Sequence, residues 1–282
     1  MSQRSLEHAL RESIRGEVRF DAGSRALYAT DGSNYRQVPI GVVIPKERED
    51  IIRTVALCRE FNAPVLNRGG GTSLAGQCCN VAVVIDSSKY LNRLIEIDPD
   101  RRLARVEPGL ILDDLRSAAE QFHLTFGPDP ATHSRCTLGG MIGNNSCGVH
   151  SLMSGKTAEN IESMQILTYD GEIMEVGKTT DDELQRILQE SGPKAQIYSR
   201  LKRLSDGYAD LVRARFPRIP RRVSGYNLDE LLPENGFHVA RSLAGTEGTC
   251  ITVLEATVRL VPSPPHRSLL VLGYPDLYVA CD

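Results

Sequence analysis

A glycine-rich segment constrains this chain more than any other feature of its sequence. It follows a short apolar stretch, and four glycines occupy the eight positions from Gly69 to Gly76. Glycine adopts positive φ without steric cost and lets the main chain approach a ligand, so consecutive N–H groups can converge on phosphate oxygens. Arg68, Thr72 and Ser73 add side-chain donors. Taken alone, the segment is either an anion-binding loop or an ordinary surface turn.

Two further tracts of glycine and small polar residues follow. One contains Pro128 and Asp129 and continues from Cys136 to Gly148. It is too rich in glycine and asparagine for an ordinary core helix, and it offers amide and hydroxyl groups along an extended ligand. The other, residues 245–249, has the composition of a tight turn with a carboxylate. The tract up to Gly148 could be a loop packed for its own sake, and Glu247 in the short turn could either accept from ribose hydroxyls or cap the turn. The glycine segment and the tract up to Gly148 together favour a large phosphate-bearing cofactor.

Length and charge exclude several classes of function. The 282 residues predict roughly two structural units, at ~150 residues per domain. With 33 basic and 36 acidic residues, the net charge of -3 gives no general reason to bind nucleic acid or an anionic membrane. Neither a signal peptide nor an apolar run of about 20 residues is present in the sequence. We expect a cytoplasmic protein without a transmembrane segment, or one that reaches a membrane only through a partner.

Several common binding-site motifs are excluded because the spacing of their residues does not occur in this sequence. The seven cysteines include no C-x-x-C pair, so a disulfide framework and a zinc or iron–sulfur site are not expected. The sequence Gly155-Lys156-Thr157 resembles the end of a P-loop, but His150 stands where that loop needs glycine. Leu74 likewise breaks the dinucleotide fingerprint G-x-G-x-x-G. The histidines lack metalloprotease spacing, so no metal is expected.

Hydrophobic periodicity predicts a mixture of helices and strands. Helices are predicted over residues 5–14, 47–61, 111–122, 181–189 and 197–211. Strands are predicted over residues 42–44, 64–66, 81–85, 94–97, 103–106, 161–168, 172–176 and 250–261. The glycine segment should lie at the edge of a small sheet that is buried by helices. Residues 269–273 start another apolar strand, and residues 275–280 could start a helix.

Turn residues and prolines divide the chain into four parts. We expect an N-terminal leader over residues 1–37, a first subdomain with the glycine segment over 38–98 and a second subdomain over 99–262. Three prolines within residues 262–265 end the second subdomain, because proline cannot continue a strand ladder. Residues 263–282 are expected to start a further domain of a truncated larger protein, a substrate or cap domain.

The order of these motifs resembles the vanillyl-alcohol oxidase type of FAD-linked oxidoreductase. Within that family the chain looks most like D-lactate dehydrogenases, glycolate oxidase flavoprotein subunits and D-2-hydroxyglutarate dehydrogenases. The resemblance covers about residues 38–262 and rests on the glycine segment, the tract at 128–148, the run Ser224-Gly225-Tyr226-Asn227-Leu228 and the turn at 245–249. It implies an α+β fold of two subdomains, one with a small mixed sheet and one with a larger antiparallel sheet and flanking helices, with FAD extended between them.

The resemblance also implies which residues bind the cofactor. Arg68 to Ser73 would cradle the pyrophosphate, and Thr137 to Gly148 would run along the ribityl chain and the flavin. Family members with covalent flavin place a histidine where this chain has Thr72, so non-covalent FAD is expected. The run at 224–228 could line the same cleft. The expected cofactor-binding residues are Arg68, Gly69, Gly70, Gly71, Thr72, Ser73, Pro128, Asp129, Thr137, Gly139, Gly140, Asn144, Ser146, Gly148, Asn160, Ile161, Glu247, Gly248 and Thr252.

The activity that the resemblance implies is oxidation of a D-2-hydroxy acid of the lactate, glycolate or 2-hydroxyglutarate class. A hydride would pass from the α-carbon to flavin N5 while a base takes the hydroxyl proton, and electrons would continue to a quinone, cytochrome, iron–sulfur protein or flavoprotein. In such relatives the substrate-binding arginine, the catalytic histidine and the metal ligands lie in a cap region, expected here beyond residue 282. No catalytic residue can therefore be named, and this chain alone is expected to be incomplete for turnover.

Two alternatives remain open from the sequence. The chain could be a non-catalytic FAD-carrying subunit that needs a second chain to complete its site. It could also belong to a flavoenzyme of the same architecture with another substrate, such as an alditol oxidase or a cell-wall reductase.

Overall fold

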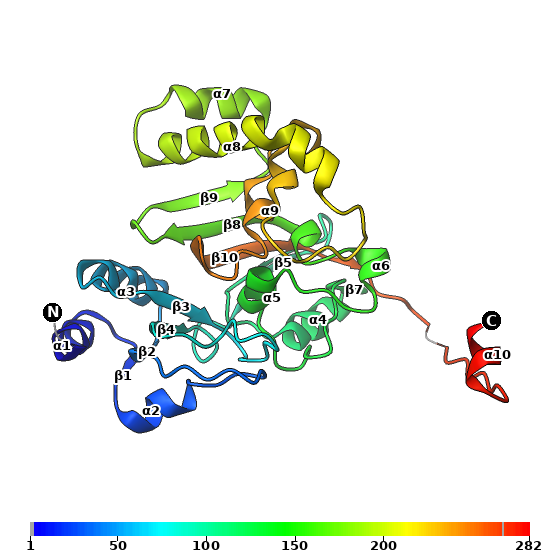
Figure 1. Ribbon diagram of the computed structural model, residues 1–282, viewed down its shortest axis with the longest axis horizontal. Helices are drawn as coiled ribbons and strands as arrows, with labels where there is room; N and C mark the ends of the chain where they lie inside the picture. Colours follow the sequence, from blue (N-terminus) through cyan, green and yellow to red (C-terminus); the bar gives the residue numbers. More distant parts are fainter. Residues whose placement is uncertain (1–2, 267) are drawn as a thin grey trace.

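The computed structural model describes residues 3–266 and 268–282 and contains two main sheets, each with its own helices (Figure 1). The four-stranded sheet has the order β1-β2-β4-β3, and the five-stranded sheet has the order β5-β6-β10-β8-β9. The α+β fold with a small mixed sheet and a larger antiparallel sheet is confirmed. No helix of the described residues is long and apolar enough to cross a membrane.

The four-stranded sheet is mixed and nearly buried. Strands β2 (Gly41–Ile44), β4 (Val83–Asp86) and β3 (Val65–Arg68) are parallel, while β1 (Glu17–Arg19) pairs with β2 in the antiparallel sense. Every residue of β2 and β4 is buried, as expected for apolar strands covered on both faces.

Helices of the first hundred residues cover this sheet. Helix α1 (Gln3–Ser13) packs on α3 (Arg48–Glu60), and α2 (Ala22–Leu27) connects β1 to β2. Leu6 and Leu10 of α1 join the core beneath β2. The segment predicted as a leader is therefore packed against the first sheet; the domain boundaries at residues 37, 98 and 262 stay predictions.

The five-stranded sheet is antiparallel and has two unlike faces. Its strands are β5 (Leu94–Asp98), β6 (Leu103–Val106), β8 (Ile161–Thr168), β9 (Ile173–Gly177) and β10 (Ile251–Arg259). Apolar residues alternate toward the helices and charged residues point away from them, because side chains alternate along a strand. The predicted hairpin at Asp170-Gly171 joins β8 to β9.

Helices cover the apolar face of the five-stranded sheet. They are α4 (Leu112–Glu120), α5 (Leu138–Asn144), α7 (Asp181–Gln189), α8 (Pro193–Arg215) and α9 (Val239–Leu243). The shorter elements are β7 (Leu124–Thr125), α6 (Ser151–Ser154), β11 (Val261–Pro262) and α10 (Leu277–Cys281), with 3-10 turns at Ala158–Asn160, Leu228–Leu231 and Pro233–Asn235.

An apolar cluster joins the two halves of the molecule. It combines Ile51 and Val55 of α3 and Ile85 of β4 with Leu167 of β8 and Leu254 of β10, all buried. Residues far apart in sequence therefore fix the two sheets beside each other, and the loops at the ends of their strands meet along one cleft.

Two sequence predictions differ from the structure. The tract at 136–148 was expected to be too rich in glycine for a core helix, yet residues 138–144 form α5. Leu138, Met141 and Ile142 share one buried face at helical spacing, which leaves the glycines on the opposite face. Residues 269–273 form no strand, because a strand needs a pairing partner and this tail leaves the body of the molecule (Figure 1).

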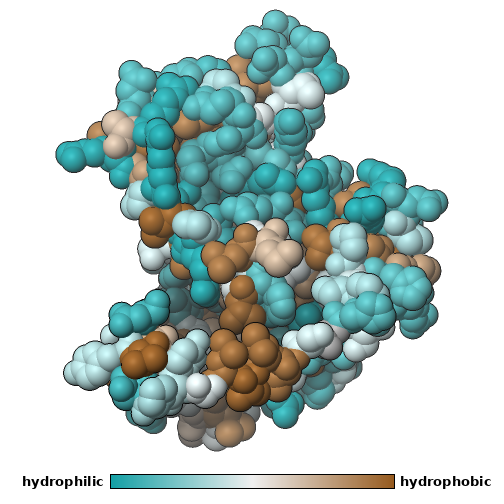
Figure 2. Space-filling model, turned by 90° about the vertical axis from the view of Figure 1, so that its right-hand side faces the viewer, coloured by the Kyte–Doolittle hydropathy of each residue, from teal (hydrophilic) through white to brown (hydrophobic). Residues whose placement is uncertain are grey.

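The tail, residues 269–282, also exposes several large apolar side chains to solvent. Leu269 and Val271 are at least 80% exposed, and Tyr278 of α10 is 83% exposed. Figure 2 shows the side of the molecule that carries the tail, where brown apolar residues interrupt a mainly teal surface.

One buried histidine predicts a pH dependence of stability. His238 is 4% exposed and caps α9, its Nδ1 accepting from the amide of Arg241 at 3.4 Å. Burial, followed by the Arg241 charge, lowers the pKa of His238 from 6.5 to about 4. Since the unfolded chain binds the proton more tightly, the free energy of unfolding should fall as the pH drops from 6.5 toward 4, by up to about 3 kcal/mol.

The variant His238→Asn isolates this effect, because asparagine also caps helices and does not titrate. Denaturant unfolding at pH 7.5 and pH 4.5 should show a smaller loss of stability for the variant than for the natural chain. Identical losses in the two proteins would contradict the assignment.

Candidate functional site

A cleft opens where the loops of the two subdomains meet. Two adjoining hollows of about 80 and 280 Å³ form it, and they share six lining residues. The shared residues are Gly69, Gln77, Cys78, Thr137, Gly140 and Asn144. We call these two hollows the central cleft. The glycine segment, α5 and the turn at 245–248 form its walls.

The glycine loop, residues 69–76, leaves β3 and packs tightly against the segment before α5. A Cβ at Gly69 would lie 2.1 Å from Oγ1 of Thr137, and one at Gly70 would lie 2.2 Å from the Arg135 carbonyl oxygen. These distances are far shorter than van der Waals contact. Only glycine therefore fits at both positions.

Three successive amides of the glycine loop are free donors within the described part of the chain. Among the residues that the structure describes, no protein group accepts a hydrogen bond from the amides of Gly70, Gly71 or Thr72. All three residues line the larger hollow of the central cleft. Three successive unsatisfied N–H groups in a concave loop form the kind of site that holds an anion.

The Arg68 side chain, which was expected to contact a ligand, binds backbone carbonyls of the protein. Its guanidinium donates to the carbonyls of Thr30 at 2.9 Å, Cys78 at 3.0 Å and Tyr28 at 3.3 Å. It also lies 5.2 Å from the centre of the Tyr28 ring. Burial raises the pKa of the Cys78 thiol, and the Arg68 charge opposes that rise. The side chain thus holds both ends of the glycine loop while it lines the cleft.

Helix α5 presents small residues to the cleft. Thr137 caps the helix by accepting from the Gly140 amide at 3.2 Å, and Asn144 donates to the Gly140 carbonyl at 3.0 Å. Gly139 faces Pro108 so closely that a Cβ would lie 2.9 Å from the Pro108 carbonyl oxygen. The helix therefore offers a flat, largely backbone wall.

The turn at residues 245–248 forms another wall of the cleft, and its backbone is strained. Gly245, Glu247 and Gly248 all have positive φ, which for Glu247 costs roughly 1 kcal/mol. The amides of Gly245 and Glu247 donate to carbonyls of α5, those of Ile142 and Gly143, both at 2.9 Å. A glutamate held in this conformation is the type of outlier that collects at functional sites.

Gln77 is a cleft residue that the sequence did not single out. Its Nε2 donates to Oε1 of Glu247 at 3.3 Å, so it spans the cleft from the glycine loop to the turn. Its Oε1 is buried without a partner among the described residues, a state it shares with Nδ2 of Asn145. Unsatisfied buried polar atoms are uncommon. No sequence signal marks Gln77, because its partner lies 170 residues away.

Most of the predicted residues meet at the cleft. Those lining it are Arg68, Gly69, Gly70, Gly71, Thr72, Ser73, Thr137, Gly139, Gly140, Asn144, Ser146, Glu247 and Gly248. Thr252 lines a side pocket that adjoins the cleft at Gly248 and Ile251, and it accepts from Nδ2 of Asn67 at 3.0 Å.

The other five predicted residues lie behind the cleft, and their part in cofactor binding stays a prediction. They are Pro128, Asp129, Gly148, Asn160 and Ile161. Asp129 accepts from the amide and the imidazole of His150, at 3.0 and 2.5 Å. Asn160 donates to two carbonyls of the segment after α5, and Ile161 is buried in the core. These residues hold the wall in place.

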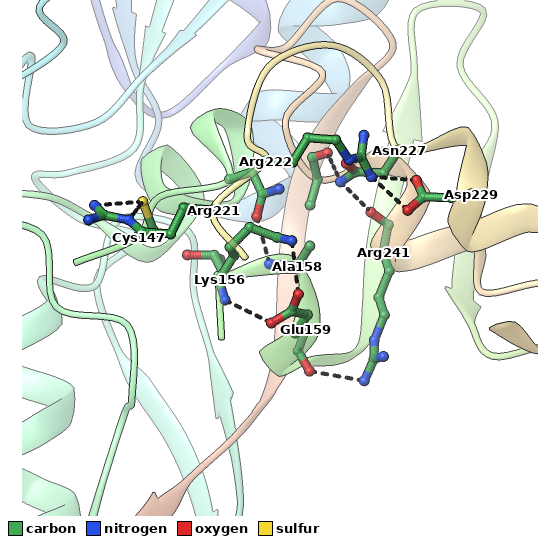
Figure 3. A network of polar contacts seen from close by, with 12 residues as sticks. Cys147, Lys156, Ala158, Glu159, Arg221, Arg222, Asn227, Asp229 and Arg241 are labelled. Atoms are coloured by element: carbon green, nitrogen blue, oxygen red, sulfur yellow. Dashed lines mark hydrogen bonds and ion pairs between the residues drawn. The ribbon is translucent and has the colours of Figure 1, made fainter. Parts of the chain in front are cut away.

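A polar network supports the strained turn from behind (Figure 3). Asn227 is 2% exposed and donates to the carbonyl of Ala244 at 2.9 Å, directly before the turn. Arg222 forms an ion pair with Asp229 at 2.6 Å beside it. The run at 224–228, expected to line the cleft, lines neither of its hollows and instead braces its wall.

A larger hollow lies elsewhere and is not a better candidate. It measures about 560 Å³ and lies over the charged face of the five-stranded sheet. Some of its charged groups are already paired, Arg105 with Glu255 at 3.2 Å and Glu162 with Arg259 at 2.8 Å. Within the described part of the chain, no group of three or more histidine, cysteine, aspartate or glutamate side chains could hold a metal ion.

Comparison with known proteins identifies a matching family and similar chains. Residues 39–177 match the family described as FAD binding domain. The chain is 32% identical over 271 residues to D-2-hydroxyglutarate dehydrogenase from Pseudomonas putida, covering 94% of this chain and 27% of that protein. It is 27% identical over 274 residues to glycolate oxidase subunit GlcD from Escherichia coli, covering 96% of this chain and 44% of that protein. The chain thus spans between about a quarter and a half of the length of these relatives.

Solved structures support the fold alone. The chain aligns with alkyldihydroxyacetonephosphate synthase at a TM-score of 0.66 and 18% identity, covering 94% of this chain and 42% of that one.

The unpaired oxygen of Gln77 predicts a contact with a ligand hydroxyl. Gln77→Leu should weaken FAD binding about three- to tenfold, because the variant cannot accept a hydrogen bond. The empty protein should lose little stability, since the change removes an unsatisfied polar atom. Fluorescence titration with FAD and thermal melting measure the two effects. The matched change at exposed Gln121, Gln121→Leu, should alter neither, and unchanged FAD affinity in Gln77→Leu would refute the contact.

Proposed function

We propose that this chain, which contains an FAD binding domain at residues 39–177, is the FAD-binding portion of a flavin-dependent dehydrogenase acting on a D-2-hydroxy acid. The support for the substrate class is the likeness to D-2-hydroxyglutarate dehydrogenases and to glycolate oxidase subunits. Both names describe oxidation of a hydroxyl next to a carboxylate. The electron acceptor we propose is a quinone, a cytochrome, an iron–sulfur protein or another flavoprotein.

The row of free amides at Gly70, Gly71 and Thr72 is the observation that carries the proposal. A dinucleotide has a doubly charged pyrophosphate, and convergent N–H groups in a glycine loop bind such a group without a bulky side chain. The unpaired Oε1 of Gln77 needs a donor, which a sugar hydroxyl supplies. The donor set of the cleft therefore fits FAD.

Different parts of the cleft would hold different parts of the cofactor. The glycine loop would hold the pyrophosphate. The side chains of Gln77, Asn144 and Glu247 would form hydrogen bonds with hydroxyl groups of the cofactor. The small residues of α5 would leave room for a flat ring. The side pocket at Thr252 would hold a part of the cofactor that reaches beyond Gly248.

When bound, FAD supplies a two-electron acceptor for the hydride of the substrate α-carbon. The residues of this chain position that acceptor. None of the residues that line the described cleft is a histidine, and Glu247 is its single carboxylate. Glu247 already accepts from Gln77 and is placed to bind rather than to move a proton. We therefore propose that the base for the substrate hydroxyl comes from outside this cleft, either from another part of the protein or from a second chain.

The first prediction from this proposal concerns the colour of the protein. Purified protein, or protein mixed with FAD, should show the yellow absorption of oxidised flavin, and acid precipitation should release all of it because Thr72 offers no covalent link. Flavin that stays with the precipitate would refute the non-covalent assignment. A colourless protein that takes up no added FAD would refute the cofactor site itself.

A second prediction concerns the glycine loop. Gly70→Ala should weaken FAD binding at least about tenfold, because its Cβ would meet the Arg135 carbonyl oxygen at 2.2 Å and displace the loop. Gly207→Ala in α8 is the control, since no atom lies within 4 Å of a Cβ there. Titration with FAD measures both. Equal affinities in the two variants would show that the loop does not bind the cofactor.

A further inference from the structure

A loop of the N-terminal segment lies against the back of the glycine loop. We propose that residues 29–37, here named the leader loop, are part of the cofactor site and orient the glycine loop for binding. This loop precedes residue 39, where the match to the FAD binding domain begins. The inference rests on the proposed binding of the pyrophosphate at Gly70 to Thr72.

The leader loop is a closed structure of its own. Thr30 and Arg36 form an antiparallel bridge, and the amide of Gln37 donates to the Ala29 carbonyl at 2.9 Å. Inside it, Oδ1 of Asp31 accepts from the amide of Ser33 at 2.8 Å. A loop with its ends tied together can act as a rigid support rather than as a flexible linker.

Three contacts connect the leader loop to the glycine loop and to Cys78, two residues beyond its end. The amide of Gly32 donates to the Gly71 carbonyl at 3.0 Å, and the amide of Cys78 donates to Oδ2 of Asp31 at 3.2 Å. The Tyr35 ring covers Gly76 so closely that a Cβ there would lie 2.7 Å from Cδ2 of the ring. The contacts fall on the middle and the end of the glycine loop.

Arg68 strengthens this attachment from the other side. Its guanidinium bonds to the carbonyl of Thr30 and to that of Tyr28, directly before the leader loop. The Tyr28 hydroxyl in turn donates to Asp86 at 2.6 Å, and Asp86 is the register partner of Arg68 in the sheet. Burial, followed by the hydrogen bond to Asp86, raises the pKa of Tyr28. The leader is therefore fixed to the strand from which the glycine loop begins.

The contact from Gly32 has a directional consequence. The C=O of Gly71 and the N–H of Thr72 belong to one planar trans peptide and point in opposite directions. Because Gly32 holds that C=O on the side of the leader loop, the N–H of Thr72 points to the opposite side. Thr72 lines the central cleft, and its N–H has no acceptor among the described residues. The leader loop thus directs a donor of the anion site.

The test compares two glycines of the same N-terminal segment. A Cβ at Gly32 would lie 2.9 Å from the Ser73 carbonyl oxygen and 3.3 Å from that of Thr72, so Gly32→Ala should displace the glycine loop. Gly23 lies in α2, where a Cβ would meet only the side chain of Asp21, at 3.3 Å. Gly32→Ala should weaken FAD binding about tenfold, whereas Gly23→Ala should leave it unchanged.

A spectroscopic readout separates orientation of the loop from a general loss of structure. The phosphorus NMR signals of bound FAD should shift in Gly32→Ala at saturating cofactor, while the melting temperature of the empty protein stays close to that of Gly23→Ala. A second pair changes the other contact: Asp31→Ala should weaken FAD binding, and Asp31→Asn, which keeps one acceptor oxygen, should restore part of it.

The outcomes distinguish this inference from the proposed function. If the unaltered chain binds FAD and both Gly32→Ala and Asp31→Ala bind it equally well with unshifted phosphorus signals, the leader loop has no part in the site. If the unaltered chain itself takes up no FAD, the proposed function fails and this inference fails with it.

Discussion

Close packing of the glycine loop on two sides is the constraint on which the candidate site depends. Arg135 and Thr137 press on Gly70 and Gly69 from the side of α5, and the leader loop holds Gly71 from behind. Between these surfaces the loop has no room for side chains at 69–71, so its N–H groups are what it presents to the cleft. The same contacts tie together three segments that lie far apart in the sequence.

The parts of the fold that the sequence predicted are those set by local pattern. Continuous apolar runs gave β2 and β4, and an Asp-Gly turn gave the hairpin of β8 and β9. Helix α5 was missed because glycine is a poor helix former, and burial of its apolar face overrode that preference. The strand expected at 269–273 has no partner among the described residues. The resemblance to flavoproteins supplied most of the cleft residues.

What the sequence could not predict depends on contacts between distant segments. The role of Arg68 in binding the pyrophosphate stays a prediction, and its bonds to the carbonyls of Tyr28 and Thr30 could not be predicted because these groups come within its reach only once the chain has folded. Gln77 gained its importance from Glu247, which lies 170 residues away in the turn before β10. Conversely, Asp129 and Asn160 stand in motifs that resemble a cofactor site, yet their side chains bind the protein itself. A motif identifies a region, whereas the direction of each side chain follows from packing.

The peptide between Gly71 and Thr72 shows how narrowly the charge preference of such a site is defined. Gly71 and Thr72 both allow the present orientation of the peptide between them. Gly71, which has φ +65°, can also adopt many other backbone conformations. A half-turn of the peptide would replace the N–H in the cleft by a carbonyl oxygen, which attracts cations and repels phosphate. The single hydrogen bond from Gly32 opposes that rotation. On the proposal that an anion binds here, the preference for an anion over a cation at this position depends on a bond that lies outside the cleft.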